Sequence, residues 1–152
     1  MSRFSNKVVV VTGASGGIGR AASLRFASEG ASIVAVDMNE ETLGETVNLV
    51  EEAGGKAHGV IADVTVSSEV ENYVNQATDV FGGVDVLFNN AGIEGHVAPL
   101  ESYDEEIFDK VLQVNVKGVW LGMRYVVDAL RLRGGGNIVN TASGAGLMAT
   151  PT

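Results

Sequence analysis

Short apolar runs alternate along this chain with longer segments in which apolar residues recur every three or four positions. Runs of strand length cover residues 7–12, 32–37, 56–62, 84–89 and 137–142. Segments of helical period lie between them, at residues 17–29, 40–53, 67–81 and 103–131. Strands that alternate with helices in this way are typical of a parallel sheet covered on both faces.

The segment 67–81 shows the helical pattern most clearly. Its apolar residues fall on one face of a helix, and they are Val70, Tyr73, Val74, Ala77 and Phe81. Ser67 or Ser68 is expected to cap the start, and the Gly82-Gly83 pair is expected to end the helix. Because right-handed crossovers leave few topologies, we predict a doubly wound (Rossmann) parallel sheet of about five strands with helices on both faces.

The chain has 152 residues, of which 45% are hydrophobic, so residues 1–152 are expected to form one dinucleotide-binding domain. The fifth apolar run would be a sheet edge that nothing in the sequence covers. We therefore expect the domain to be incomplete at its carboxyl end, with further strands and helices missing.

Charge and composition narrow the function classes. The chain carries 19 acidic and 10 basic residues, with no Lys/Arg block that could follow a phosphate backbone, so nucleic acid is not an expected partner. It has no cysteine, and His58 and His96 lie in different segments, so no metal site is expected. No run reaches membrane-spanning length, and we expect a soluble, cytoplasmic protein without membrane partners.

The first strand leads into a glycine-rich turn, Thr12-Gly13-Ala14-Ser15-Gly16-Gly17-Ile18-Gly19, and a helix follows directly. Such a turn lets the backbone approach a pyrophosphate and points unpaired helix N–H groups at its charge. The alternative is a glycine-rich turn without a ligand. The strand before it and the helix after it favour cofactor binding by Gly13, Ser15, Gly17, Ile18 and Gly19.

Asp37 ends the second strand, roughly twenty residues after the glycine turn. An acid at this place can accept hydrogen bonds from the adenosine ribose, and its charge would repel a 2'-phosphate. Asp37 therefore predicts NAD(H) in preference to NADP(H), the alternative being a solvated acid at a strand end.

Three polar segments follow later in the chain. The residue types of Asn89-Asn90-Ala91-Gly92 predict a turn directly after the fourth strand. Asn115 interrupts an apolar stripe that includes Phe108, Val111 and Leu112, and a buried amide there would need partners. Ser143 lies in a loop of glycine and alanine after the fifth strand, where its hydroxyl could bond a substrate oxygen.

Together, the glycine turn and Asn89-Asn90-Ala91-Gly92 match the motifs TGxxxGxG and NNAG, and the chain resembles the short-chain dehydrogenase/reductase family over essentially its whole length. The resemblance implies an oxidoreductase that transfers a hydride between NAD(H) and a secondary alcohol or ketone. It also implies roles for single residues. Adenine would be contacted by Asp63 and Val64. The NNAG segment would hold the sheet and, through Asn89, Ala91 and Gly92, line the nicotinamide side of the cofactor site.

The resemblance makes Asn115 the residue that anchors a proton-relay water through its helix backbone, and Ser143 the substrate-orienting serine. It also requires a Tyr followed four residues later by a Lys. Tyr73, Tyr103 and Tyr125 are not followed by Lys at that spacing. The pair is expected beyond Thr152, so we predict cofactor binding but little or no turnover from these 152 residues alone.

Two other functions are compatible with parts of the sequence. A non-catalytic dinucleotide-binding or regulatory protein could dock onto a full-length relative through the bare edge strand. A Rossmann-like methyltransferase fits the glycine spacing and the NNAG segment less well, because its cofactor has no pyrophosphate. For the full-length enzyme, the resemblance implies a homo-oligomer, either dimer or tetramer. Residues 93–102 are expected to border the substrate pocket, but they do not identify the alcohol or ketone.

Overall fold

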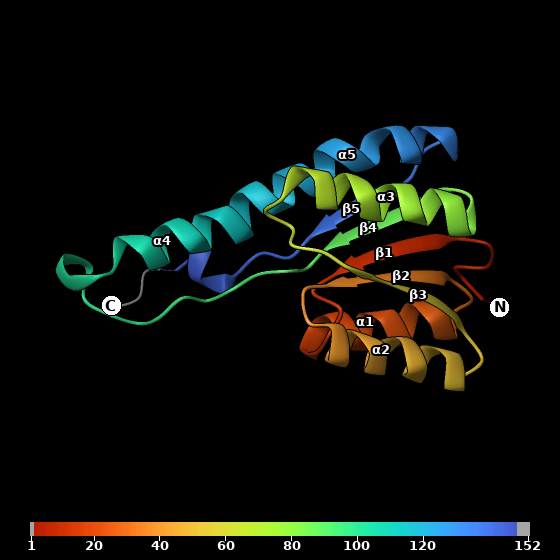
Figure 1. Cartoon of the computed structure of the whole chain (residues 1–152), viewed down its shortest axis with the longest axis horizontal. Coiled ribbons are helices and arrows are strands. Elements are labelled where there is room, and N and C mark those ends of the chain that lie inside the picture. The colour runs from red at the N-terminus through yellow and green to blue at the C-terminus, as the bar shows by residue number, and fades with distance from the viewer. Residues whose placement is uncertain (1, 149–152) are drawn as a thin grey trace.

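The computed structural model describes residues 2–148 and contains a single sheet of five parallel strands. The strands are β1 (Val8–Thr12), β2 (Ser32–Asp37), β3 (Lys56–Ile61), β4 (Val86–Asn89) and β5 (Asn137–Asn140). Their order in the sheet is β3-β2-β1-β4-β5, as Figure 1 shows. The chain thus reverses direction across the sheet between β1 and β4, which confirms the predicted doubly wound fold. In such sheets the crevice at the carboxyl ends of the two central strands is the usual ligand site.

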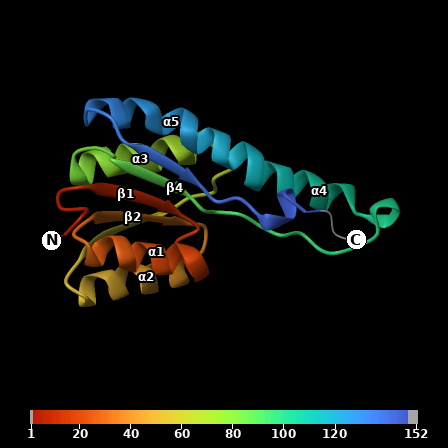
Figure 2. The same cartoon turned by 180° about the vertical axis from the view of Figure 1, so that it is seen from behind.

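Helices cover both faces of the sheet. One face carries α1 (Gly17–Ser28) and α2 (Glu40–Glu52), and the other carries α3 (Ser67–Phe81) and α5 (Val119–Leu132) (Figures 1 and 2). Alternation along β1 supplies both cores, because Val8 and Val10 belong to the α3/α5 side and Val9 and Val11 to the α1/α2 side. This central strand is therefore apolar from Val8 to Val11, as expected for a strand buried on both faces.

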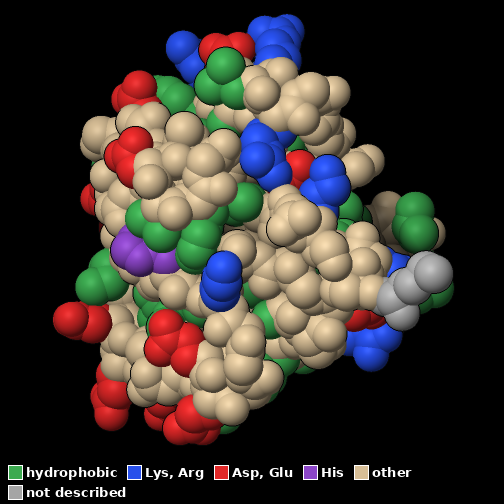
Figure 3. Space-filling view, turned by 90° about the vertical axis from the view of Figure 1, so that its right-hand side faces the viewer, with side chains coloured by type: hydrophobic (Ala, Val, Ile, Leu, Met, Phe, Trp, Pro, Cys, Tyr) green, Lys and Arg blue, Asp and Glu red, His purple; other side chains and the backbone are tan. Residues whose placement is uncertain are grey.

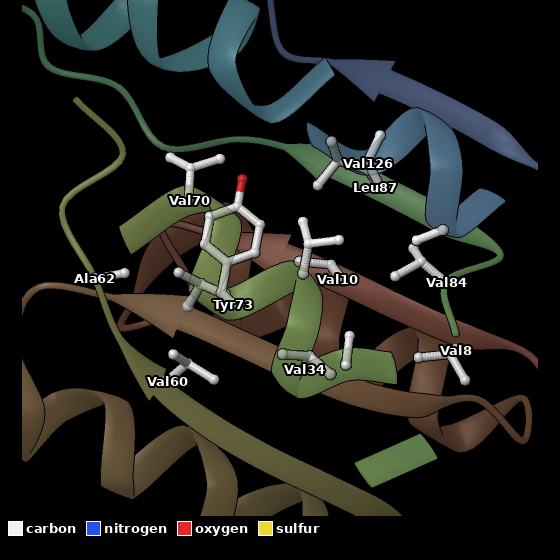
Figure 4. Close-up of a cluster of buried hydrophobic side chains, with 14 of the residues drawn as sticks. Val8, Val10, Val34, Val60, Ala62, Val70, Tyr73, Val84, Leu87 and Val126 are labelled. Carbon is white, nitrogen blue, oxygen red and sulfur yellow. The ribbon is translucent and has the colours of Figure 1, made fainter. Parts of the chain in front are cut away.

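Tyr73 is the largest fully buried side chain of the core between the sheet and α3. Its ring points from α3 toward the sheet, close to Val10 and Val70 (Figure 4). The predicted apolar face of this helix is confirmed, and Gly82 ends the helix in the left-handed region, at φ +84°. The predicted serine cap is wrong, because Val66 precedes the first turn and no side chain caps it.

The prediction of one continuous α-helix over residues 103–131 is wrong, because the structure divides this segment into three parts. Asp104 accepts hydrogen bonds from the N–H groups of Glu106 and Ile107, at 2.8 and 3.3 Å, and so starts α4 (Glu105–Leu112) later than predicted. A π-helical stretch, Gln113–Gly118, then separates α4 from α5. Stretches of this kind are rare and occur frequently at functional sites.

Only part of the apolar stripe predicted on this helix is buried in the core. In Figure 1, α4 extends past the carboxyl ends of the strands, beyond the sheet that would cover it. Phe108 and Leu112 are consequently exposed, at 53% and 43%. The strand ends also differ slightly from prediction, since β4 begins at Val86 and β5 ends at Asn140.

Candidate functional site

A cavity of about 650 Å³ opens at the carboxyl ends of the strands, next to the point where the strand order reverses. Five segments contribute its walls: the glycine turn after β1, the end of β2, the end of β3, the loop after β4, and α4 with the first residues of the π-helical stretch. The predicted cofactor residues among its walls are Gly13, Asp37, Asp63, Val64, Ala91 and Gly92.

The glycine turn approaches the loop after β4 so closely that side chains are excluded. Gly13 adopts φ +67°, and a Cβ there would lie 2.9 Å from the Cα of Ala91. A Cβ on Gly19 would lie 2.0 Å from the carbonyl oxygen of Gly13. Glycine is therefore required at both positions, one for its backbone conformation and one for packing of the helix against the turn.

Asp37 connects the end of β2 with the glycine turn. Its Oδ2 accepts a hydrogen bond from the N–H of Ser15 at 3.0 Å, and its Oδ1 accepts one from the N–H of Asn39 at 3.1 Å. Each carboxylate oxygen keeps a further lone pair for another donor. The same residue thus orders the turn and presents a negative charge to the cavity.

Asp63 and Val64 form the wall that follows β3. The Oδ1 of Asp63 accepts from the N–H of Thr65 at 2.8 Å, and its own N–H donates to Glu69 at 2.6 Å. Val64 packs against Gly118 at the end of the π-helical stretch, where an added Cβ would come within 2.8 Å of a Val64 methyl. The loop is therefore held from both sides, with Val64 between the cavity and the helix.

The NNAG segment joins the two central strands. Thr12, which is buried, accepts with its Oγ1 from the N–H groups of Asn90 and Ala91, both at 3.0 Å. The Asn90 side chain returns a hydrogen bond to the carbonyl of Thr12 at 3.1 Å. The two motifs that carried the resemblance are thus hydrogen-bonded to each other.

Asn89 is not among the residues that line the cavity, and it connects neighbouring elements instead. Its side chain is buried, and its Nδ2 donates to the Oδ1 of Asn140 at 3.0 Å and to the carbonyl of Val119 at 3.3 Å. Asn89 therefore connects β4 to β5 and to α5.

Asn115 lies in the π-helical stretch and is exposed, which corrects the expectation of a buried amide. The oxygen and the nitrogen of the amide are nevertheless both hydrogen-bonded. Its Oδ1 accepts from the N–H of Ile93 at 2.9 Å, and its Nδ2 donates to the carbonyl of Ile93 at 2.8 Å. This pair of bonds fixes the loop that follows Gly92, one of the cavity walls.

Several predicted residues lie outside this cavity. Ser143 is exposed, and its Oγ accepts from the N–H of Ala145 at 3.2 Å, capping the short 3-10 turn Gly144–Gly146. Ile18 is 65% exposed and lines a second, apolar groove of about 430 Å³ beside α1. Ser15, Gly17 and Gly19 shape the turn rather than the cavity wall.

Sequence reasoning missed the wall that α4 and the π-helical stretch contribute. This wall consists of Glu106, Asp109, Lys110, Gln113 and Val114. Its members recur at helical spacing, which was a usable signal, but mostly polar residues on a helix face are ordinarily read as facing solvent. Only the position of α4 over the ends of the strands reveals them.

Two general features of the described residues bear on the kind of site. No helix within residues 2–148 is both long and apolar enough to span a membrane. Over the same residues, no three His, Asp or Glu side chains are grouped where they could hold a metal ion.

Comparison with known proteins identifies the family. A model described as short chain dehydrogenase matches residues 7–152. Levodione reductase from Leifsonia aquatica is 43% identical over 148 residues, which are 96% of this chain and 55% of that protein. Cyclohexanol dehydrogenase from Acinetobacter sp. (strain SE19) is 40% identical over 147 residues, or 97% of this chain and 59% of that protein.

Solved structures agree with the sequence relatives. The crystal structure of NAD+-bound xylitol dehydrogenase superposes with a TM-score of 0.95 at 41% identity, over 98% of this chain and 57% of that one. The crystal structure of levodione reductase gives a TM-score of 0.93 at 41% identity, over 97% and 58% of the two chains. The present chain thus spans less than two thirds of the length of these relatives. It belongs to the short-chain dehydrogenase family.

Proposed function

We propose that the cavity binds NAD(H) and that the complete protein transfers a hydride between this cofactor and a secondary alcohol or ketone. The observation that carries the proposal is that Gly13 and Asp37 line the same cavity, which lies next to the point where the strand order reverses. A glycine-rich turn beside a carboxylate suits a pyrophosphate followed by a ribose. The NAD+-bound xylitol dehydrogenase among the structural neighbours supports the choice of cofactor.

Asp37 is the proposed selector between NAD(H) and NADP(H). Its two oxygens each accept one backbone N–H and retain capacity for the ribose hydroxyls. A 2'-phosphate would place like charges side by side, and two charges about 4 Å apart near a protein surface repel by about 4 kcal/mol. We therefore propose preference for NAD(H).

The remaining walls suit the adenine end of the cofactor. Val64 and Val114 present apolar side chains to the cavity, and Asp63 lies beside Val64 with a carboxylate that can accept from an exocyclic amine. On the other side, Ala91 and Gly92 expose backbone with little side-chain bulk. We propose that they leave room for the nicotinamide half. Asn89 would stabilise this part of the site through its bonds to Asn140 and Val119.

The proposed catalytic residues of this chain are Asn115 and Ser143. When bound, the nicotinamide ring supplies the hydride donor or acceptor, and the protein orients the substrate and moves the proton. The Ser143 hydroxyl accepts one backbone N–H and keeps its proton to donate to a substrate oxygen. Asn115 lies in a π-helical stretch, and we propose that the backbone of this stretch holds a proton-relay water.

The general acid/base is not provided by a Tyr with the required Lys within residues 1–152. Turnover is therefore proposed for the complete protein. The names of the relatives levodione reductase and cyclohexanol dehydrogenase support a ketone or alcohol as the substrate class. Assembly of the complete enzyme into a dimer or tetramer, and a cytoplasmic location, remain predictions.

The test is a pair of titrations with NADH and NADPH, followed by nicotinamide fluorescence, on the wild type and on Asp37→Ala. Because this substitution also removes the acceptor for Ser15, the decisive quantity is the ratio of the two dissociation constants. We expect the wild type to prefer NADH and Asp37→Ala to shift the ratio toward NADPH by at least about 10-fold. Asp79→Ala, which removes an exposed acid from α3, is the matched control.

An unchanged ratio in Asp37→Ala would reject Asp37 as selector, and absence of NADH binding by the folded wild type would reject the site. A non-catalytic dinucleotide-binding protein would give the same titrations and differ only in turnover. The dehydrogenase and reductase relatives favour the oxidoreductase.

A further inference from the structure

The backbone of Ala14 and Ser15, in the middle of the glycine turn, is bonded on every side. The N–H of Ala14 donates to the carbonyl of Val36 at 3.1 Å, and its carbonyl accepts from the hydroxyl of Thr46 at 2.9 Å. The N–H of Ser15 donates to Asp37, as described above. The carbonyl of Ser15 accepts from the guanidinium of Arg20, at 2.6 Å.

Arg20 and Thr46 form the part of this network that lies behind the turn. The Nε of Arg20 donates to the hydroxyl of Thr46 at 2.9 Å. Its Nη2 also lies 3.0 Å from the carbonyl of Thr42 and 2.8 Å from a carboxylate oxygen of Glu45. Arg20 therefore bridges the first turn of α1, the glycine turn and α2.

Burial makes these bonds hard to replace by water. Thr46 is fully buried, and the Arg20 side chain is only 27% exposed. Removing the Thr46 hydroxyl would leave the Ala14 carbonyl without this partner in the interior. Neither side chain is among the residues that line the cavity, and both lie behind the turn.

We infer that Arg20 and Thr46 are positioning residues for cofactor binding, and that they act by fixing the conformation of the glycine turn. This inference rests on the proposed function. Gly13 and Gly17, with φ of +67° and +51°, leave the turn free to adopt many conformations. A turn already held in one of them need not lose that freedom when the pyrophosphate binds.

The pyrophosphate is the part of the cofactor that the turn would meet, and this gives the inference its distinguishing signature. Loss of Arg20 or Thr46 should weaken ligands that carry a pyrophosphate and spare a ligand without one. It should weaken NADH and NADPH alike, because Asp37, the proposed selector, stays in place. Arg20 and Thr46 thus differ in their expected effect from Asp37, which is expected to change the ratio.

The experiment uses the complete protein that contains this chain, with the substitutions Arg20→Met and Thr46→Val. Arg25→Met is the matched control, because Arg25 lies on the same helix and pairs with Glu29 rather than with the turn. NADH and NADPH are titrated directly, and ADP and adenosine compete with NADH. We expect NADH, NADPH and ADP to weaken by about 10-fold, and adenosine by less than about 2-fold. Hydrogen exchange of the amides of residues 14–17 should become faster.

Unchanged affinities, or equal weakening of ADP and adenosine, would overturn the inference. Arg20→Lys adds a rescue test if Thr46→Val fails to fold. Lysine keeps the charge but cannot bridge as many acceptors, so its affinity for ADP should lie between those of the wild type and Arg20→Met. If the wild type binds no NADH, the proposed function fails instead. Exchange at residues 14–17 in Arg20→Met then decides separately whether Arg20 holds the turn.

Discussion

The substitution Asp85→Asn is expected to lower the free energy of unfolding by about 2–3 kcal/mol. Asp85 lies just before β4, at the amino ends of the strands, and its side chain is only 3% exposed. Its Oδ1 accepts from the Lys7 ammonium, and its Oδ2 accepts from the Val8 N–H and the Arg133 guanidinium, all at 2.9 Å. The carboxylate thus ties β1 to the turn that enters β5.

The magnitude follows from what asparagine can keep. It is neutral and offers one oxygen and one NH2 group, so at least one of the present donors would face another donor. A hydrogen bond to a charged group contributes about 1.5–3 kcal/mol, and breaking a fully buried ion pair costs about 3–5 kcal/mol. Lys7 and Arg133 are 49% and 30% exposed, so water can solvate them after the change. Because of this solvation, we expect the loss of unfolding free energy to be smaller than the value for a fully buried ion pair.

Urea denaturation at pH 7 measures the loss, and Asp128→Asn is its control. Asp128 also pairs with an arginine, Arg131, but the two side chains are 88% and 75% exposed. Exposed pairs contribute about 0–1 kcal/mol, so we expect the control to lose less than about 0.5 kcal/mol. Figure 3 shows the face at the amino ends of the strands, where acidic and basic side chains lie side by side at the top and acidic side chains gather at the bottom. Equal losses of unfolding free energy in the two variants would refute the conclusion that the buried Asp85 carboxylate stabilises the fold.

The pH dependence provides a second check on Asp85. Burial would raise the pKa of its carboxyl, but hydrogen bonds from Val8, Lys7 and Arg133 outweigh burial and lower it. Its contribution to stability is therefore present above the ordinary pKa of about 3.9 and is lost as pH falls through the lower folded value. The difference between wild type and Asp85→Asn should shrink below about pH 4. The Glu29 carboxyl, whose pKa is lowered to about 2 chiefly by its hydrogen bond from Arg3, titrates in both proteins and cancels.

Three further substitutions test other parts of the structure. Gly19→Ala places a Cβ 2.0 Å from a backbone oxygen of the turn, and thermal melting should show a loss of at least about 2 kcal/mol together with weaker NADH binding. Tyr73→Phe removes a hydroxyl that has no partner among the described residues and whose pKa burial raises; urea denaturation should show unchanged stability or a gain of up to about 1 kcal/mol. Asn115→Ala removes both bonds to Ile93, and hydrogen exchange should become faster at the Ile93 amide while stability falls by only about 1 kcal/mol.

The sheet could be predicted because its strands are apolar for a reason that is visible in sequence. A strand covered on both faces needs apolar residues at every position, and β1 supplies Val8 to Val11 without interruption. The glycine turn was equally predictable, since Gly13 and Gly19 occupy places where any side chain would collide with backbone. Constraints of this kind act on single residues and leave a direct mark in the sequence.

The helix through Asn115 could not be predicted in the same way. Its apolar residues keep a helical period across α4, the π-helical stretch and α5, and periodicity alone does not reveal where the hydrogen-bond pattern changes. Nor does it reveal where a helix passes the end of the sheet and exposes Phe108 and Leu112. The polar face that α4 turns to the cavity looks solvated for the same reason.

The side chains that fix the glycine turn from behind could not be predicted from the motif either. Gly13 and Gly17 permit the turn but also permit many others, because glycine restricts the backbone least. Selection of one conformation must come from elsewhere, and here it comes from Arg20, Asp37 and Thr46 through bonds that span 5 to 32 residues of sequence. A glycine motif therefore predicts where a dinucleotide can approach. How tightly it is held depends on side chains that the motif does not contain.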